Sequence, residues 1–381
     1  MKCFKNATVY VEGSGLCKRN VYFSEKIEKI TRLPRFNAEE IPLPDDAIVL
    51  PGFIDRHIHG AGGSDTMDAT AADLETIAKT IAKEGVTGFL ATTMTQSEES
   101  ILNALRAVKE YRAEKREGAR LLGVHLEGPF IAEGYKGAQS SEYIAEPDVK
   151  VFSKYNEASG NAIKAVTLAP EKKTAISLIK HLSSNGITAS IGHSDAGYED
   201  IAEAVKAGAS GVTHTYNAQR GLHQREVGVV GSAMLFDELT CELIADTIHV
   251  SSPAMKLLVK NKPSDKVILI TDAIRAKGLS DGRSELGGQE VYVKNGEARL
   301  ADGTLAGSVL QMNRAIQNMV TKVGVPLERA VDYAALNPAR ALNADGECGS
   351  IKRGKRADFA VLNSNFDVIL TVIGGEIIYG G

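Results

Sequence analysis

Short apolar runs in this sequence end in side chains that can bind a metal ion. The ends of four such runs supply five candidate ligands, which are His57, His59, Glu127, His193 and His214. Imidazole and carboxylate groups are the ligands that zinc takes in catalytic sites, and Fe, Mn and Co ions accept the same donors. We therefore expect a divalent metal site, with zinc as the first choice.

The spacing of the first two histidines indicates how they point. Alternate side chains of a strand share a face, so His57 and His59 should point together into the fold. By the same alternation Glu127 takes the more distal position on its strand, and His125 is interpreted as a structural or supporting residue. A lone histidine in a buried strand is more often a hydrogen-bonded core residue. The combination of ligands at four strand ends, and no single histidine, is the basis of the metal hypothesis.

An aspartate after the last of these runs supplies a group for proton transfer. Asp272 stands in the segment TDA. A metal ion polarises a carbonyl and lowers the pKa of bound water. A carboxylate beside it can take a proton from that water and return it to a leaving nitrogen. Together these groups suit amide hydrolysis. Two other interpretations of Asp272 stay open: a further metal ligand, or a helix N-cap before Ala273.

Eight apolar runs alternate with helix-like segments along the middle of the chain. The runs are AIVLPGFID, VTGFLATT, RLLGVHLEG, IKAVTLAP, ITASIGHS, SGVTHTYN, CELIADTIH and KVILITDA, and the segments between them include AADLETIAKTIAKEG, EESILNALRAVKEYRAE, KKTAISLIKHLSSNG and GYEDIAEAVKAGA. The runs are rich in Val, Ile and Leu, as in parallel strands that are buried on both faces. The segments between them repeat apolar residues at intervals of three and four and end in glycine. This order predicts an α/β fold, a (β/α)8 TIM barrel whose active site lies at the C-terminal ends of the strands. A doubly wound open sheet is the alternative.

Both ends of the chain have a different pattern, in which apolar residues alternate with polar ones and glycine turns separate the runs. We therefore expect a small β-sandwich domain formed by residues 1–48 together with residues 347–381. Residues 49–346 would form the metal-dependent (β/α)8 barrel catalytic domain between them.

Composition excludes several functional classes for this 381-residue chain. Its formal net charge is −4 and it has no basic block, which argues against nucleic acid as the main partner. Four scattered cysteines without a CxxC spacing predict neither a disulfide framework nor a cysteine-based zinc site. We find no apolar run of about 18 residues and no signal-peptide pattern, so we expect no membrane span and a cytoplasmic location.

The segments around these residues resemble the amidohydrolase superfamily. The matching motifs are PGFIDRHIHG, HLEGPF, GHSDA, THTYNAQ, an Asp-x-x-His, TDA and LAGS. HLEGPF, THxxNA, the Arg225-Glu226 pair and LAGS are similar to one family in particular, the N-acetylglucosamine-6-phosphate deacetylases. The likeness continues into NPARAL and GSIKRGKRADFAVL, so it covers nearly the whole chain. It implies metal-dependent hydrolysis of N-acetyl-D-glucosamine 6-phosphate to D-glucosamine 6-phosphate and acetate.

The resemblance also implies roles for the candidate ligands and the aspartate. Glu127, His193 and His214 match metal ligands that are present throughout the family. The histidine pair matches a second set that only some members keep, so the implied content is one or two metal ions per chain. Asp272 matches the catalytic aspartate, the general base and acid of the reaction.

Substrate contacts follow from the resemblance in the same way. They are implied for Ala138, Gln139, Asn217, Ala218, Arg225, Asp246, His249, Leu305, Ala306 and Gly307. Arg225 matches a phosphate-binding arginine that family members supply from the partner subunit of a homodimer, and His249 matches a histidine near the acetyl carbonyl. Gln139 stands where many members have histidine, and its amide still offers a donor and an acceptor.

Other functions stay open at this point. The same chemistry on N-acetylgalactosamine 6-phosphate, or another N-acyl amidohydrolase reaction, is the nearer alternative. The remote alternative is a non-catalytic amidohydrolase-like scaffold. A scaffold would be expected to have lost ligands, whereas this sequence keeps all five and the aspartate.

Overall fold

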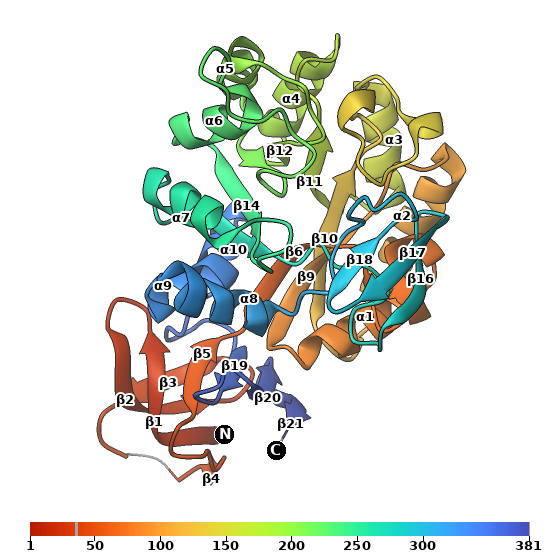
Figure 1. Cartoon of the computed structure of the whole chain (residues 1–381). Helices are drawn as coiled ribbons and strands as arrows, with labels where there is room; N and C mark the ends of the chain where they lie inside the picture. Colours follow the sequence, from red (N-terminus) through yellow and green to blue (C-terminus); the bar gives the residue numbers. More distant parts are fainter. Residues whose placement is uncertain (35–36, 381) are drawn as a thin grey trace.

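The structure is a computed structural model that describes residues 1–34 and 37–380. Two sheets of eight strands each make up its framework, one of them parallel, and each sheet has its own hydrophobic core (Figure 1). Residues 35–36 and 381 belong to the predicted terminal domain but lie outside the described residues.

The parallel sheet contains one strand from each of the eight predicted apolar runs. Its strand order is β15-β14-β13-β12-β11-β10-β9-β6. The bounds are β6 (Phe53–Ile58), β9 (Val86–Thr92), β10 (Arg120–Glu127), β11 (Ile163–Leu168), β12 (Thr188–Ile191), β13 (Gly211–Val212), β14 (Thr240–Ile244) and β15 (Val267–Ile270). The two ends of this strand order also meet. Just after β15, the Asp272 amide donates a hydrogen bond to the carbonyl of His57 in β6 at 2.9 Å. The prediction of a parallel, barrel-like sheet is thereby confirmed.

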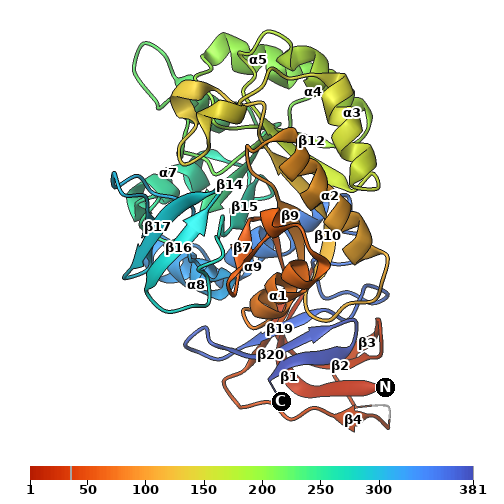
Figure 2. The ribbon, with the colours of Figure 1, turned by 90° about the vertical axis from the view of Figure 1, so that its right-hand side faces the viewer.

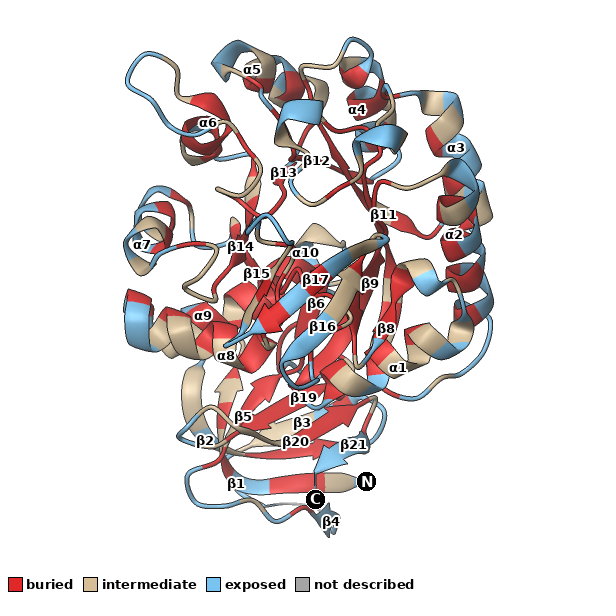
Figure 3. Ribbon diagram, turned by 45° about the vertical axis from the view of Figure 1, so that its right-hand side comes forward, coloured by how far each residue is buried: buried red, intermediate tan, exposed pale blue. Residues whose placement is uncertain are grey.

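Helices surround this sheet, and most of them bury one face and expose the other (Figure 3). The four helical segments that we expected from periodicity are α1 (Ala71–Ala82), α2 (Glu98–Arg112), α4 (Ala175–Ser184) and α5 (Tyr198–Ala207). In α1, the Thr70 side chain caps the first turn by accepting from the Asp73 amide, and Leu74, Ile77 and Ile81 are buried. The further helices are α3 (Val149–Ala158), α6 (Gly228–Leu235), α7 (Ser252–Asn261), α8 (Met312–Asn318), α9 (Leu327–Ala334) and α10 (Leu336–Ala341).

Strands from both ends of the chain form the second sheet, where the two chain termini also lie (Figure 1). It runs β21-β20-β19-β5-β1-β2-β3, with β4 paired to β1. The bounds are β1 (Lys2–Val11), β2 (Gly15–Phe23), β3 (Ile27–Thr31), β4 (Glu39–Glu40), β5 (Ile48–Pro51), β19 (Phe359–Leu362), β20 (Val368–Ile373) and β21 (Glu376–Gly380). Phe4, Phe23 and Phe359 pack together at its centre.

The run AIVLPGFID differs from our expectation of a single strand. Its first part is β5, which pairs with β1 and β19 in the terminal sheet, and its second part is β6 of the parallel sheet. The division falls at Gly52. A Cβ at this position would lie 2.3 Å from the Thr87 side chain, so the chain can pass this close to β9 only as glycine.

A small antiparallel sheet after β15 was not predicted. It consists of β16 (Gly282–Leu286), β17 (Gln289–Lys294) and β18 (Glu297–Arg299), joined by turns at Gly287-Gly288 and Asn295-Gly296 (Figure 2). The remaining short elements are β7 (Gly60–Ala61), β8 (Ser64–Asp65), η1 (Thr66–Asp68), η2 (Glu133–Tyr135), η3 (Ser141–Tyr143) and η4 (Met319–Val323). Within the described ranges, no helix combines the length and apolar character needed to cross a bilayer.

Candidate metal centre and active site

The five candidate ligands meet around one carboxylate, that of Glu127 at the end of β10. Its Oε1 lies 3.1 Å from His193 Nε2 and 3.0 Å from His214 Nε2. Its Oε2 lies 3.1 Å from His59 Nε2 and 3.5 Å from His57 Nε2. Two imidazoles therefore face each carboxylate oxygen. This arrangement contains two potential metal groups that share Glu127, and all five side chains are buried.

Three residues of the site have a backbone conformation that is uncommon outside glycine. His193, His214 and Asp272 have φ values of 48°, 29° and 49°, and each is the second residue after its strand, β12, β13 or β15. Such conformations cost about 1–3 kcal/mol each and persist only where the surroundings impose them. They turn three strand ends toward Glu127 and are typical of functional sites.

The donor set fits a divalent cation. The Nε2 atoms of His193 and His214 are only 3.1 Å apart while both face Glu127. The other ring nitrogen of His193 lies 2.8 Å from the Tyr135 carbonyl, which can only accept, so this Nδ1 carries the proton and Nε2 is free to bind a metal. Neutral imidazole nitrogens and a shared carboxylate are what a two-metal or one-metal zinc site uses.

The charges of the cluster support the same interpretation. Burial alone would raise the pKa of Glu127, but the charge of His57 and hydrogen bonds from His193 and His214 hold this pKa well below its usual range. Burial lowers the pKa of His59, but the carboxylates of Asp272 and Glu127 outweigh it and raise the pKa to about 10. The carboxylates of the site are therefore stabilised by positive charge beside them. Either protons on the histidines or a divalent cation can supply that charge.

Asp272 lies at the edge of the cluster, next to both histidines of the first strand end. Its Oδ1 is 3.4 Å from His57 Nε2 and 3.2 Å from His59 Nε2. Burial alone would raise the pKa of Asp272, but the charges of these two histidines lower it to about 2. An ionised carboxylate in this place can accept a proton from a water molecule in the site.

The segment 305–308 runs directly along Asp272. The Ser308 amide donates to the Asp272 carbonyl at 2.8 Å. Gly307 has a φ of 59°, and a Cβ there would lie 2.9 Å from the Asp272 carbonyl oxygen and 2.5 Å from Ile274 Cγ2. Only glycine allows this approach. Leu305 and Ala306, the two preceding candidates, are thereby brought beside the aspartate.

A second histidine–carboxylate pair follows β14. The Asp246 carboxylate lies 2.6 Å from His249 Nδ1 and also accepts from the Ile248 and His249 amides at 2.8 Å. Burial lowers the pKa of His249, but Asp246 outweighs it and raises the pKa, and the charge of Asp272 acts in the same direction. His249 thus has a fixed ring orientation and can donate a proton or a hydrogen bond.

Several of the other candidates touch the metal ligands or their neighbours. Gln139 Nε2 lies 3.3 Å from His193 Nε2, and Gln139 Oε1 accepts from the Thr95 amide at 2.9 Å. The Asn217 side chain donates to the His214 carbonyl at 3.2 Å. The carbonyls of Ala218 and Ala138 accept, respectively, from the Ser194 amide at 3.2 Å and from the side chain of Gln289.

Among the described residues, no hydrogen bond or ion pair joins the Arg225 side chain to the cluster. It is exposed on the loop after β13, and its amide donates to His223 Nδ1 at 3.2 Å. Its guanidinium has no ion pair with any residue of the described chain. The guanidinium is therefore available to a group from outside this chain.

Two buried neighbours of the cluster, Glu242 and Arg56, were not predicted from the sequence. Glu242 of β14 lies 3.2 Å from His57 Nδ1 and 2.9 Å from Arg56 Nε, and all three side chains are fully enclosed. Burial alone would raise the pKa of Glu242, but Arg56 and His57 lower it to about 2. The sequence does contain a signal for this pair: Glu242 and Arg56 are charged residues inside the apolar runs CELIAD and GFIDRHI. Because buried charges require partners, two such residues in neighbouring parts of one core could have been expected to pair.

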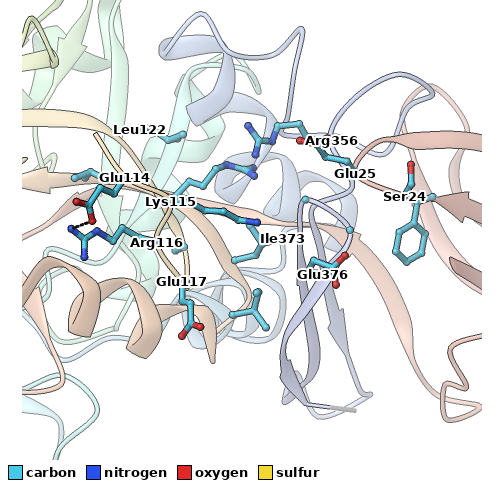
Figure 4. A pocket seen from close by; sticks show the side chains of 18 of the residues that line it. Ser24, Glu25, Glu114, Lys115, Arg116, Glu117, Leu122, Arg356, Ile373 and Glu376 are labelled. Atoms are coloured by element: carbon cyan, nitrogen blue, oxygen red, sulfur yellow. Dashed lines mark ion pairs between the residues drawn. The ribbon is translucent and has the colours of Figure 1, made fainter. Parts of the chain in front are cut away.

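A cavity of about 900 Å³ lies away from this centre, where the turn between α2 and β10 meets the terminal sheet (Figure 4). Charged side chains line it, and several are paired, as in Lys2–Glu376 at 2.9 Å and Arg116–Glu114 at 2.8 Å. None of the candidate ligands lines it, so this cavity is separate from the metal centre.

Comparison with known proteins agrees with this geometry. The amidohydrolase family profile matches residues 48–378. The N-acetylglucosamine-6-phosphate deacetylase of Bacillus subtilis (strain 168) is 45% identical over 345 residues, which cover 90% of this chain and 87% of the relative. An N-acetylgalactosamine-6-phosphate deacetylase of Escherichia coli O157:H7 is 38% identical over 333 residues, with 87% and 88% covered.

A solved structure shows the same fold over almost its full length. It is an aspartate-to-alanine mutant of N-acetyl-D-glucosamine-6-phosphate deacetylase from Mycobacterium smegmatis, in complex with N-acetyl-D-glucosamine-6-phosphate. The TM-score is 0.92 at 30% identity, and the alignment covers 99% of this chain and 98% of that chain.

Proposed function

Because this chain belongs to the amidohydrolase family, we propose that it hydrolyses N-acetyl-D-glucosamine 6-phosphate to D-glucosamine 6-phosphate and acetate. One observation carries the proposal. Four imidazoles face the Glu127 carboxylate and an ionised Asp272 lies beside two of them, in a chain 45% identical to a deacetylase of that name. A non-catalytic scaffold would not need to retain this set.

The family is metal-dependent, and the candidate ligands would hold the ion. A bound divalent metal supplies polarisation of the acetyl carbonyl and a lower pKa for water in the site. Asp272 accepts a proton from the attacking water and returns it to the nitrogen as the amide C–N bond breaks. His249, oriented by Asp246, donates a hydrogen bond to the carbonyl oxygen as negative charge develops on it. Acetate then carries the oxygen of that water.

We assign the metal as zinc, with one or two ions per chain. The neutral imidazoles and the shared carboxylate favour zinc, while Fe, Mn and Co ions remain chemically acceptable to the same donors. Two ions are possible because Glu127 presents one oxygen to each pair of histidines.

Substrate recognition is assigned to the side chains around the cluster. Asn217, Ala218 and the segment 305–307 surround the site at different strand ends, while Ala138 and Gln139 approach from the loop after β10. The exposed Arg225 would hold the phosphate of a substrate bound to the partner in a homodimer. Its free guanidinium supports this assignment, since a planar fork suits a phosphate.

The dimer assignment has a direct test. Arg225→Ala chains mixed with Asp272→Asn chains should regain activity, because a heterodimer then has one site with its aspartate from one chain and its arginine from the other. Each variant mixed with itself is the control. A mixture no more active than the two variants alone would show that the site is complete within one chain.

The division into domains is part of the same proposal. Residues 1–48 with 347–381 would form a small β-sandwich domain, and residues 49–346 the catalytic barrel. The shared terminal sheet and its separate hydrophobic core support this division. The described contacts of the terminal sheet also include β5, which begins at Ile48 and continues past the proposed boundary. We assign the enzyme to the cytoplasm on composition.

An acetate-release assay on three matched sugars tests the activity. The metal-loaded protein should act fastest on N-acetylglucosamine 6-phosphate and slowly on unphosphorylated N-acetylglucosamine. The third sugar in the assay is N-acetylgalactosamine 6-phosphate. It is the alternative substrate, and the name of the Escherichia coli relative supports its inclusion. A preference for this epimer would replace the leading assignment, and no acetate from any of the three would contradict deacetylation altogether.

A further inference from the structure

Glu242 contacts the side of His57 that faces away from the metal cluster. Its Oε2 lies 3.2 Å from His57 Nδ1, while Nε2 of the same ring faces Glu127 and Asp272. A carboxylate that is ionised can only accept a hydrogen bond, so the proton of His57 resides on Nδ1 whenever this ring is neutral. The lone pair of Nε2 is then directed at the cluster.

Two contacts besides that with His57 hold Glu242 in place. Arg56 Nε lies 2.9 Å from Oε1, and the Thr215 amide donates to the Glu242 carbonyl at 2.8 Å. Glu242 is 1% exposed and Arg56 is 1% exposed, so neither group has water as an alternative partner. The charges of Arg56 and Glu242 thus balance each other before His57 is considered.

His125 completes the support of the same ring. The two imidazole centroids are 4.5 Å apart at 77°, and His125 Nε2 lies 2.7 Å from Thr167 Oγ1. The Thr167 hydroxyl continues to Thr213 at 2.8 Å. His57 is therefore enclosed by a carboxylate on one side and by a hydrogen-bonded ring on another.

We propose that Glu242 is a positioning residue for His57: it keeps the ring in the Nδ1-protonated form and aims Nε2 at the cluster, so that metal binding by the His57–His59 half of the site depends on it. The inference deepens the proposed function, since it concerns the metal on which that function rests. It assigns a role to a buried carboxylate that was not among the residues predicted from the sequence.

The surroundings of Glu242 suit a residue that orients His57 better than a ligand of a further metal ion. His57, His125 and Glu242 lie near enough for their ligand atoms to share an ion. The Arg56 guanidinium already balances this carboxylate. A cation placed here would meet the positive charge of Arg56 at short range, which low polarity makes costly.

Stepwise Co²⁺ and Zn²⁺ titration of the metal-depleted full chain tests the inference without relying on turnover. His59→Ala identifies the binding step that belongs to the His57–His59 half. Glu242→Gln, which keeps the shape but offers an amide to Nδ1, should weaken that same step by about 10–100-fold and leave the other step unchanged. Glu242→Asp, which retains the charge at a longer distance, should give an intermediate loss.

Glu84→Gln is the matched control. Glu84 is also a buried glutamate in an ion pair, 2.8 Å from Lys277, but it contacts none of the candidate ligands. Its substitution should lower the melting temperature and leave both binding steps intact. A Glu242→Gln variant that weakens both steps equally, or neither, overturns the inference. So does a wild-type protein with one binding step that His59→Ala does not alter. Failure to release acetate contradicts the proposed function alone, because the titration reads metal binding directly.

Discussion

Replacing Asp272 by asparagine isolates its part in proton transfer. Asparagine is the appropriate substitution because the residue has a φ of 49°, a region that asparagine tolerates as well as aspartate does. The backbone bonds from Asp272 to His57 and from Ser308 to Asp272 are also retained, since neither uses the side chain. The variant should therefore fold normally while losing the carboxylate that we propose as the carrier of the proton.

The expected loss follows from the geometry of the carboxylate. Its Oδ1 lies 3.2 Å from His59 Nε2 and 3.4 Å from His57 Nε2, so it borders the space in which the ion and the reacting water would lie. A positioned general base contributes about 10²–10⁴ in rate. At about 1.36 kcal/mol per factor of ten, this corresponds to about 2.7–5.4 kcal/mol of transition-state stabilisation.

The assay is acetate release from N-acetylglucosamine 6-phosphate at saturating metal, with metal content measured on the same sample. The content must match that of the wild type, because Asp272 also neighbours the ligands and a lost ion would mimic a lost base. A melting temperature near the wild-type value excludes misfolding. Turnover within a factor of about three of wild type in fully loaded protein would refute the assignment of Asp272 as general base and acid, since even a weak base contributes more.

Three other perturbations have definite outcomes. Arg225→Ala should lower kcat/KM for the phosphosugar by about 10–100-fold and hardly change the slow reaction of the free sugar, because only the phosphate needs the fork; equal losses on both would make the arginine structural. His59→Ala should reduce metal content from up to two ions per chain to one, as measured by elemental analysis. Glu12 should stabilise the fold above about pH 4.5, because burial raises its pKa but bonds from Ser350 and two lysines lower it to about 2. The pKa in the folded state is thus below the ordinary one, so this stabilisation declines as the pH falls toward 2, and the difference in urea unfolding between wild type and Glu12→Gln should shrink between about pH 7 and pH 3.

The sequence predicted the elements that carry the site because each of them has a local signature. Eight apolar runs became eight parallel strands, and glycine-terminated segments became α1, α2, α4 and α5. The ligands follow from the same pattern, since parallel strands bring their C-terminal ends to one face and every candidate stood at such an end. Spacing alone placed His57 and His59 on one face, and both now face the same oxygen of Glu127.

Features that depend on partners distant in sequence were not predictable in this way. The division of AIVLPGFID into β5 and β6 depends on pairing with β19, which lies more than three hundred residues further on. The β16–β18 sheet has adequate turn signals, but its place is determined by packing against Met94 and Ile274. A periodic pattern describes one segment at a time, so it cannot say which distant strand a segment will meet.

Glu242 and Arg225 show in two ways why residue type alone does not determine a role in the site. Glu242 stands as an isolated charge in an apolar run of the sequence, and only the folded sheet reveals that it meets Arg56 and His57 there. Arg225 was assigned through its motif, yet the folded chain leaves it exposed, with its amide bonded to His223. A buried charge without a visible partner in sequence therefore indicates a partner inside the same chain. An exposed charge that the motif requires in the site supports the proposed homodimer, in which the partner's Arg225 would complete the site.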